Sequence, residues 1–209
     1  MKPADMNAYL APCEWIDFLH PDVAALAARL AHGQSHATDI ARHCFEYVRD
    51  QIAHSWDARR NPVTCKASDV LLHGTGYCYA KSHLLAALLR ANGIPAALCY
   101  QKLVLDEDGA FCLHGLNAVF LPQAGWYRID ARGNKAGIDA GFCPPQEQLA
   151  FPLQHAGEAD YPELFATPHP VIIRLLTSHA TVQQVYQHLP SACEQPWQSY
   201  QDLKPSAQT

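Results

Sequence analysis

The sequence has few of the features that mark metal-binding, redox or nucleic-acid-binding proteins. Its eight cysteines form no C-x-x-C pair, the spacing that a zinc knuckle or a thioredoxin-like site requires. Charged residues make up only 17% of the chain, and 15 Lys and Arg against 20 Asp and Glu leave a net charge of −5. An acidic chain of this kind offers no extended basic surface for phosphate groups, so we expect no nucleic-acid partner.

Long apolar runs are also missing. The longest, residues 84–100, contains Arg90, Asn92 and Gly93 and is too polar to cross a bilayer. Residues 1–6 include a lysine, a proline and an aspartate where a secretory signal would have uninterrupted apolar residues. We therefore expect a cytoplasmic protein with no membrane partner, and cysteines that form no disulfides.

The chain does contain ample material for a core, since 49% of its 209 residues are hydrophobic. This length suits one globular domain, and no repeat of a solenoid type is visible. Nine of the fifteen prolines fall within residues 144–209, without a sharp change of composition. We predict a single domain over residues 1–209, with an N-terminal helical leader, a core at about residues 36–135 and a proline-rich C-terminal wrap.

Three helices are predicted in the first half of the chain. A short helix over residues 22–30 follows a proline, apolar periodicity predicts a helix over residues 39–52, and residues 78–90 are the strongest helix by propensity. In the second helix, apolar residues recur every four positions. This spacing predicts a buried face formed by Ile40, Cys44, Val48 and Ile52, with Phe45 beside it. Cys44 is therefore expected to be a core residue.

Shorter helical stretches are expected elsewhere in the chain. Residues 68–72 fit a single turn with Ser68 as its N-cap. Residues 171–177 and 181–189 show helical patterns within the proline-rich part. Residues 73–77, with two glycines, are expected to form a flexible loop before the helix over residues 78–90.

Three runs rich in β-forming residues follow that helix, at residues 96–105, 110–121 and 126–132. Turn-forming clusters at residues 106–109 and 122–125 separate them at hairpin spacing. We predict an α+β fold in which an antiparallel sheet packs on the helix over residues 78–90.

Cys78 differs from the other cysteines because a glycine-bearing loop leads directly into it at the start of a helix. Unpaired backbone N–H groups and the positive end of the helix dipole favour a thiolate there, so Cys78 is a candidate nucleophile. The alternative is a small apolar residue in a buried helix, since cysteine is often buried. Lys81 shares this helical face; its charge could favour the thiolate, but we expect a solvated first-turn lysine.

A nucleophilic cysteine needs a base, and two histidines are close enough in the sequence to consider. His83 lies about 140° around the helix from Cys78, so its ring cannot face the thiol. His114 lies in the middle of an apolar strand, where an imidazole needs a partner, and the adjacent Gly115 suggests close approach of another group. The alternative is a hydrogen-bonded histidine of the core or sheet edge.

Asp130 is the candidate for the acid that orients the imidazole. It lies in the strand that follows the one with His114, and neighbouring antiparallel strands can place two such side chains side by side. The competing interpretation is a surface ion pair of Asp130 with Arg128 or Arg132, which share its strand face.

Three segments together resemble a known family: G-T-G-Y-C-Y-A-K-S-H-L-L-A-A-L-L-R-A-N-G-I-P-A at residues 74–96, H-G-L-N-A-V-F-L at 114–121 and G-W-Y-R-I-D-A-R at 125–132. They are similar to the core of the bacterial transglutaminase-like superfamily, whose members are often described as cysteine proteases. The upstream residues 15–21 and 47–52 resemble the leader of that family. The resemblance covers most of residues 9–135.

The resemblance implies a papain-like α+β fold with a catalytic triad at Cys78, His114 and Asp130. It implies hydrolysis or acyl transfer on a peptide or amide through a thioester on Cys78, with no metal or organic cofactor. Tyr77 stands where animal crosslinking transglutaminases have glutamine, which disfavours protein crosslinking. Residues 73–77 lack the arginine and paired glycines of arylamine N-acetyltransferases, which disfavours that substrate class.

Two other functions are compatible with these residues. The first is a scaffold of the same fold that binds a peptide or partner without turnover. The second is a metal site built from Cys112 and His114 on one strand face, with Cys99, although a fourth ligand with recognised spacing is missing.

Overall fold

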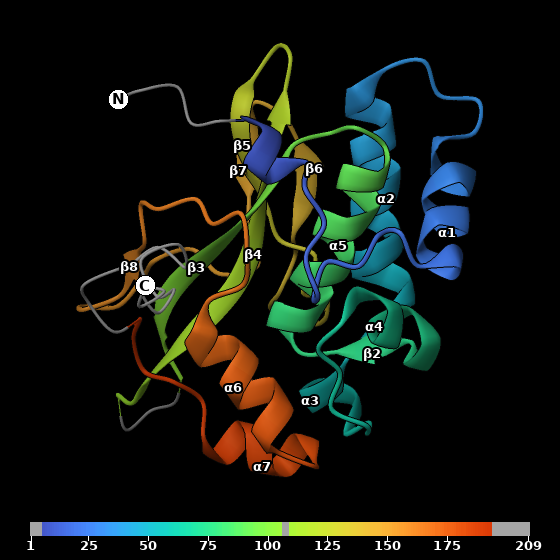
Figure 1. Cartoon of the computed structure of the whole chain (residues 1–209). Coiled ribbons are helices and arrows are strands. Elements are labelled where there is room, and N and C mark those ends of the chain that lie inside the picture. The colour runs from blue at the N-terminus through green and yellow to red at the C-terminus, as the bar shows by residue number, and fades with distance from the viewer. Residues whose placement is uncertain (1–5, 106–108, 194–209) are drawn as a thin grey trace, which may run out of the picture.

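A four-stranded antiparallel sheet forms the centre of the molecule in a computed structural model that describes residues 6–105 and 109–193 (Figure 1). The strands lie in the order β5-β4-β3-β8, and their bounds are β3 (Ala96–Val104), β4 (Phe111–Leu121), β5 (Gly125–Ile129) and β8 (Ala159–Asp160). The three predicted strands are therefore confirmed, whereas β8 was not predicted. The expected turn at residues 122–125 joins β4 to β5, and residues 106–108 of the other turn lie outside the described residues.

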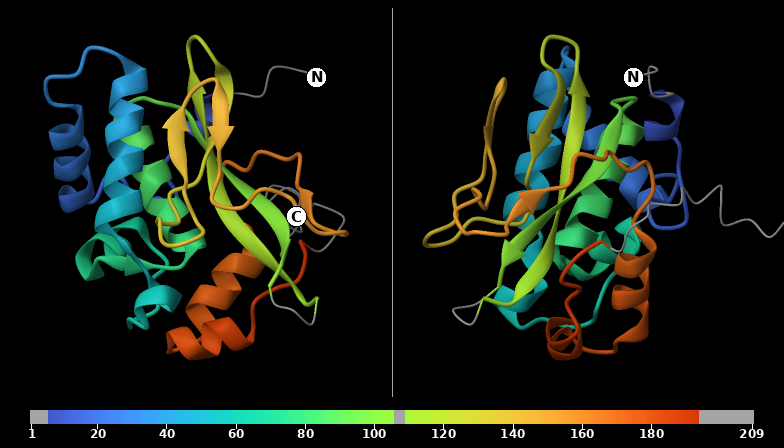
Figure 2. Two further views of the ribbon diagram at one scale, coloured as in Figure 1. Left: turned by 180° about the vertical axis from the view of Figure 1, so that it is seen from behind. Right: turned by 90° about the vertical axis from the view of Figure 1, so that its left-hand side faces the viewer.

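Helices cover one face of this sheet and irregular chain covers the other (Figure 2). The α5 helix (Cys78–Ala91) packs against β3 and β4, and residues 78–90 are all buried. Outside it lie α1 (Pro21–Ala31), α2 (Ala37–Gln51) and α4 (Ala67–His73). The predicted α+β fold, with an antiparallel sheet on the helix that begins at Cys78, is confirmed.

The predicted apolar face of α2 forms part of the main core. Cys44, Phe45 and Val48 are fully buried and Ile52 is 3% exposed, while Ile40 is partly buried at the edge. Burial also raises the pKa of the Cys44 thiol to about 12, so this side chain stays protonated.

The prediction for Ser68 is wrong. The α4 helix begins at Ala67, with Lys66 as its N-cap residue, so Ser68 lies inside the first turn. Its N–H and hydroxyl both donate to the Asp17 carboxylate, the N–H at 3.0 Å. A serine that a distant carboxylate binds cannot be distinguished from a local cap by sequence spacing.

The loop before Cys78 is held in place by a short parallel strand pair. In this pair β1 (Ala53–His54) lies beside β2 (Thr75–Gly76), and α3 (Ser55–Ala58) follows β1 directly. Thr75 and Gly76 are buried, so this part of the predicted flexible loop is paired and packed. A Cβ at Gly76 would lie 3.2 Å from the Ala80 Cβ, a tight approach that explains a glycine here.

The remaining elements wrap around the sheet. The first, η1 (Met6–Tyr9), packs near the sheet. The strands β6 (Gly141–Cys143) and β7 (Gln146–Gln148) form a hairpin beside β5, where the Phe142 ring packs against Phe45 of α2. The predicted C-terminal helices are confirmed as α6 (Pro170–Ser178) and α7 (Val182–Gln187). Residues 194–209 of the predicted wrap lie outside the described residues.

Two further observations concern the described residues alone. None of their helices has the length and apolar character needed to cross a bilayer. All eight cysteines are among them, and no disulfide joins any two.

Substitution Cys44→Ala should destabilise the protein, because it leaves a small void in the packed face of α2. We expect a loss of about 1 kcal/mol in the free energy of unfolding and a fall in Tm of about 2–4 °C. Thermal unfolding followed by circular dichroism measures this, with Cys143→Ala as control because Cys143 is exposed. Equal Tm values for the two variants would contradict the assignment of Cys44 to the core.

Candidate active site

Cys78 is the first residue of α5, and its sulfur lies at the open edge of β4. Pairing of β4 with β5 ends at Asn117 and Ile129, so the N–H of Gly115 is not used by that strand pair. This N–H instead donates to the Cys78 Sγ at 3.5 Å. Cys78 is 7% exposed. The structure therefore places the thiol against the strand of His114, at a helix N-terminus.

Gly115 permits this close approach. A Cβ at position 115 would lie 2.8 Å from the Tyr79 Cδ1 and 3.1 Å from the Tyr79 Cα, which no real side chain tolerates. The Tyr79 hydroxyl also donates to the Leu113 carbonyl on the same edge of β4. The close approach predicted from Gly115 is thus observed, and the approaching group is the first turn of α5.

His114 and Asp130 form a buried pair beside the thiol. The His114 Nε2 lies 2.7 Å from the Asp130 Oδ2, and the two residues are 4% and 0% exposed. Asp130 follows Ile129, the last residue of β5, so it lies one residue beyond the strand in which it was expected. The backbone N–H groups of Arg132 and Ala150 also donate to the carboxylate, each at 3.1 Å.

The competing ion-pair interpretation of Asp130 is wrong. Arg128 pairs with Glu147 and Asp160, and the Arg132 guanidinium pairs with Asp57. Each arginine therefore has a carboxylate partner elsewhere, and Asp130 points inward to His114.

The two buried groups stabilise each other in their charged forms. Burial alone would lower the pKa of His114, but the Asp130 carboxylate and the Cys78 sulfur, with hydrogen bonds to both, raise it to about 10. Burial likewise opposes ionisation of Asp130, yet His114 and the two backbone N–H groups keep the pKa of its carboxyl below the ordinary value. At neutral pH this site contains an imidazolium and a carboxylate.

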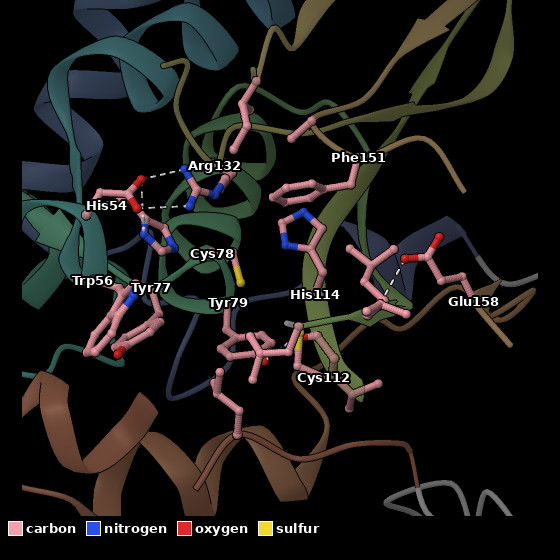
Figure 3. Close-up of a pocket in the computed structure, with 18 of the residues that line it drawn as sticks. His54, Trp56, Tyr77, Cys78, Tyr79, Cys112, His114, Arg132, Phe151 and Glu158 are labelled. Carbon is pink, nitrogen blue, oxygen red and sulfur yellow. Dashed lines mark hydrogen bonds and ion pairs between the residues drawn. The ribbon is translucent and has the colours of Figure 1, made fainter. Parts of the chain in front are cut away.

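A segment from the C-terminal part of the chain covers this pair. The Phe151 ring packs edge-on against the His114 ring, with 4.9 Å between their centroids (Figure 3). Its neighbour Ala150 supplies one of the hydrogen bonds to Asp130. Sequence analysis did not find these two residues, because nothing local to them indicates contact with groups twenty or more residues away.

A cavity of about 450 Å³ opens in front of the thiol. Figure 3 shows His114 and Phe151 on one side of Cys78, and His54, Trp56 and Tyr77 on the other. The Trp56 ring is stacked on Tyr186 of α7, with centroids 3.6 Å apart. Aromatic side chains from distant parts of the chain therefore form one wall of the cavity.

The same wall contains a cluster of charged groups. Asp57 accepts hydrogen bonds from Arg132 and Lys135, which lower the pKa of its carboxyl to about 2 although burial opposes this. Burial and the nearby Arg132 lower the pKa of His54 far below its ordinary value. His54 is therefore an uncharged imidazole at neutral pH, in contrast to His114. The sequence analysis missed His54 and Asp57, since neither belongs to a recognisable motif.

His83 is directed away from the thiol, as predicted. Its Nδ1 bonds to the Cys65 carbonyl at 2.8 Å, and burial lowers the pKa of the imidazole to about 4. The expectation for Lys81 is wrong, because this lysine is fully buried. Its Nζ donates to the carbonyls of Ile52 and Arg49, at the end of α2. Packing of α2 against the first turn of α5 could not be predicted from local sequence.

The described residues give no support to a metal site. Within residues 6–105 and 109–193, no three His, Cys, Asp or Glu side chains come together as metal ligands. Cys99 belongs to a separate apolar cluster with Tyr9 and Leu116. Cys193 is 4% exposed, whereas Cys143 is exposed.

The raised pKa of His114 should make the stability of the protein depend on pH. The folded state binds this proton up to about pH 10, whereas an unfolded histidine releases it near 6.5. The contribution of His114 is therefore complete below about pH 6.5 and is lost as the pH rises toward 10. Urea unfolding of wild type and His114→Gln should give a larger stability difference near pH 6 than near pH 9. An equal difference at both pH values would contradict the charged pair.

Comparison with known proteins agrees with this geometry. The family model of the transglutaminase-like superfamily matches residues 24–131, which is more than half of the chain and includes Cys78, His114 and Asp130. A search of curated proteins finds no match.

One of the similar solved structures supports the same kind of fold. A candidate cysteine protease from Cytophaga hutchinsonii is 18% identical with a TM-score of 0.50, over 62% of this chain and 42% of that one. The periplasmic domain of TgpA from Pseudomonas aeruginosa is 20% identical with a TM-score of 0.46, over 62% and 48%. The matched region thus spans less than half of either neighbour. The family match and the fold together show that the chain belongs to the transglutaminase-like superfamily.

Proposed function

We propose that the protein catalyses cysteine-dependent acyl transfer or hydrolysis on an amide or peptide, through a thioester on Cys78. The observation that carries this proposal is the arrangement at the start of α5. The Cys78 sulfur lies against β4 beside a buried imidazolium whose Nε2 is bonded to Asp130, which leaves Nδ1 for the thiol. A thiol, an imidazole and an orienting carboxylate in this relation are the parts that nucleophilic catalysis requires.

The reaction proceeds in two steps. The Cys78 thiolate attacks the amide carbonyl carbon to form a C–S bond, and the C–N bond then breaks as the His114 imidazolium transfers its proton to the departing amine. Water or a second amine next attacks the thioester, loses its proton to His114, and the C–S bond breaks to regenerate the thiolate. Asp130 holds the His114 ring in place throughout and stabilises its charged form.

The oxyanion of each tetrahedral intermediate needs hydrogen-bond donors. The backbone N–H groups in the first turn of α5 have no partner within the helix, and that of Cys78 is nearest to the sulfur. Together with the helix dipole, this N–H is the leading candidate for stabilising the negative oxygen.

The cavity and the chemistry indicate the kind of substrate. A cavity of about 450 Å³ suits a side chain or short peptide segment next to the reacting amide. The two steps use protein groups alone, so we propose that the enzyme works without a metal or organic cofactor. The cysteines without disulfides support action in a reducing compartment such as the cytoplasm.

One observation favours a second function, a scaffold that binds a peptide or partner without turnover. Cys78 and His114 are only 7% and 4% exposed, and Phe151 covers the imidazole. A substrate must therefore reach the thiol through the cavity in front of it (Figure 3). Turnover of any amide that is lost in Cys78→Ala decides for the enzyme, and binding that is unchanged in Cys78→Ala without turnover decides for the scaffold.

Removal of each proposed catalytic group should have a graded effect. Cys78→Ala and His114→Ala should abolish amide-directed activity, because each removes a group that forms or breaks bonds. Asp130→Asn should keep some activity, at about 10⁻⁴ of wild type, since it removes an orienting group. Initial rates on a peptide amide library measure this, with circular dichroism to confirm folding. Activity near wild-type level in Cys78→Ala would refute the enzyme.

The reactivity of Cys78 can be tested without a known substrate. A thiolate beside an imidazolium reacts with iodoacetamide at pH values where ordinary thiols are protonated. Under limiting reagent near pH 6, mass mapping should show Cys78 labelled before the other cysteines. His114→Ala should slow this labelling, because it removes the cationic partner.

The internal control for this labelling is Cys143. It is exposed, so access to the reagent does not limit its labelling, and near pH 6 it should still react more slowly than Cys78. Cys193 should react slowly at every pH, since burial raises the pKa of its thiol to about 12. Labelling of Cys143 ahead of Cys78 near pH 6 would favour the scaffold.

A further inference from the structure

Lys81 is a buried cation that neither proposed step uses. It lies three residues after Cys78 on α5, on the same side of the helix, and its side chain is fully buried. Lysine is among the residues least often buried, because the transfer of its charge out of water is costly. A lysine in this place therefore needs a physical reason.

The backbone carbonyls at the end of α2 provide its hydrogen-bond acceptors. The Lys81 Nζ donates to the Ile52 carbonyl and, at 3.4 Å, to the Arg49 carbonyl. The last carbonyls of a helix have no partner within the helix and form the negative end of its dipole. An ammonium at this point satisfies them, and it joins the end of α2 to the first turn of α5.

The Lys81 ammonium also contacts the turn that follows Asp130. A Cβ at Gly133 would lie 3.3 Å from the Lys81 Nζ and 3.4 Å from the Arg49 carbonyl oxygen. Gly133 has a φ of +115°, which side-chain-bearing residues rarely adopt. Glycine at position 133 thus lets the chain from Asp130 pass directly over the ammonium. The end of α2, the first turn of α5 and the turn at Gly133 therefore meet at the Lys81 Nζ.

The charges that face Lys81 come from each of these segments. Asp130, Asp50 and Cys78 attract the ammonium, whereas Arg132 repels it. Burial first, and then Arg132, lower the pKa of Lys81 to about 7. Lys81 in turn helps to lower the pKa of His54, which lies on the strand that follows α2. The positive charge of Lys81 therefore acts on two of the three proposed catalytic groups.

We propose that Lys81 is a positioning residue for the catalytic groups, holding α2 and the Gly133 turn against α5 and keeping a positive charge behind Cys78 and Asp130. This inference rests on the proposed function, because it concerns the ionised forms of Cys78 and Asp130. It assigns to Lys81 no contact with substrate. The predicted consequence is a pH-dependent change in the reactivity of Cys78 when the charge is removed.

The test compares wild type with Lys81→Met, which keeps an unbranched apolar side chain one atom shorter and removes the ammonium. Labelling of Cys78 by limiting iodoacetamide should slow about tenfold near pH 6 and change little near pH 9, where ordinary thiols are ionised as well. A purely structural role for Lys81 would slow labelling by the same factor at both pH values. That result would overturn the inference.

The matched control is His83→Leu. His83 is also a buried polar residue of α5, but it faces the Cys65 carbonyl, away from the thiol. This substitution should lower Tm and leave the ratio of the two labelling rates as in wild type. A ratio shifted as in Lys81→Met would show that any buried substitution in α5 has this effect, and would overturn the inference.

A second measurement avoids any variant at position 81. NMR of lysine ¹³Cε groups should show one lysine in wild type that titrates near pH 7, and its midpoint should move to lower pH in Cys78→Ala, because an attractive charge is lost. An unmoved midpoint overturns the inference.

The labelling results separate failure of the proposed function from failure of this inference. If wild-type Cys78 itself labels as an ordinary thiol, both the proposed function and the inference fail. If the labelling rate is independent of pH in both wild type and Lys81→Met, the inference alone is overturned.

Discussion

The close approach of α5 to β4 at Gly115 is the contact on which the rest of the structure depends. It puts Tyr79 in the space that a side chain at position 115 would occupy. The Cys78 sulfur then reaches the strand edge next to His114, and the adjacent hairpin strand brings Asp130 to the same point. A glycine in the middle of a strand weakens the sheet locally, because it has no side chain to pack. At Gly115 the space left free is occupied by the N-terminus of α5, which thus lies beside the His114 imidazole.

Several charged side chains are buried in and near the site, and hydrogen bonds with the backbone compensate much of the cost of burying them. The Asp130 carboxylate accepts hydrogen bonds from two backbone N–H groups besides its bond with His114, and Lys81 donates hydrogen bonds to two carbonyls. Arg90, at the other end of α5, is 3% exposed and donates to the carbonyls of Ala11, Ala96 and Ala166. Breaking one such partnership leaves an uncompensated charge, so these groups also fix where neighbouring segments lie.

The sequence predicts what is local and the order of the groups, but little of what depends on distant contacts. The helix at Cys78, the three long strands and the buried face with Cys44 follow from periodicity and turn residues, and His83 could be excluded by helical geometry. The interactions of Ser68 and Lys81 could not be predicted, because their partners come from other elements, Asp17 and the end of α2. Phe151 lies against His114 through tertiary packing alone, and no signal in its own neighbourhood indicates this.

The walls of the cavity come from two parts of the chain. Cys78, His114 and Asp130 fall within the region that the family match covers, which ends at residue 131. Phe151, which covers the imidazole, and Tyr186, which stacks on Trp56, come after that region. One part of the cavity wall is thus encoded after the stretch that contains Cys78 and His114. Under the proposed function, substitutions of Phe151 or Tyr186 would alter which molecules enter while those two residues keep their places, whereas the backbone of Ala150 helps to hold Asp130 and must stay as it is.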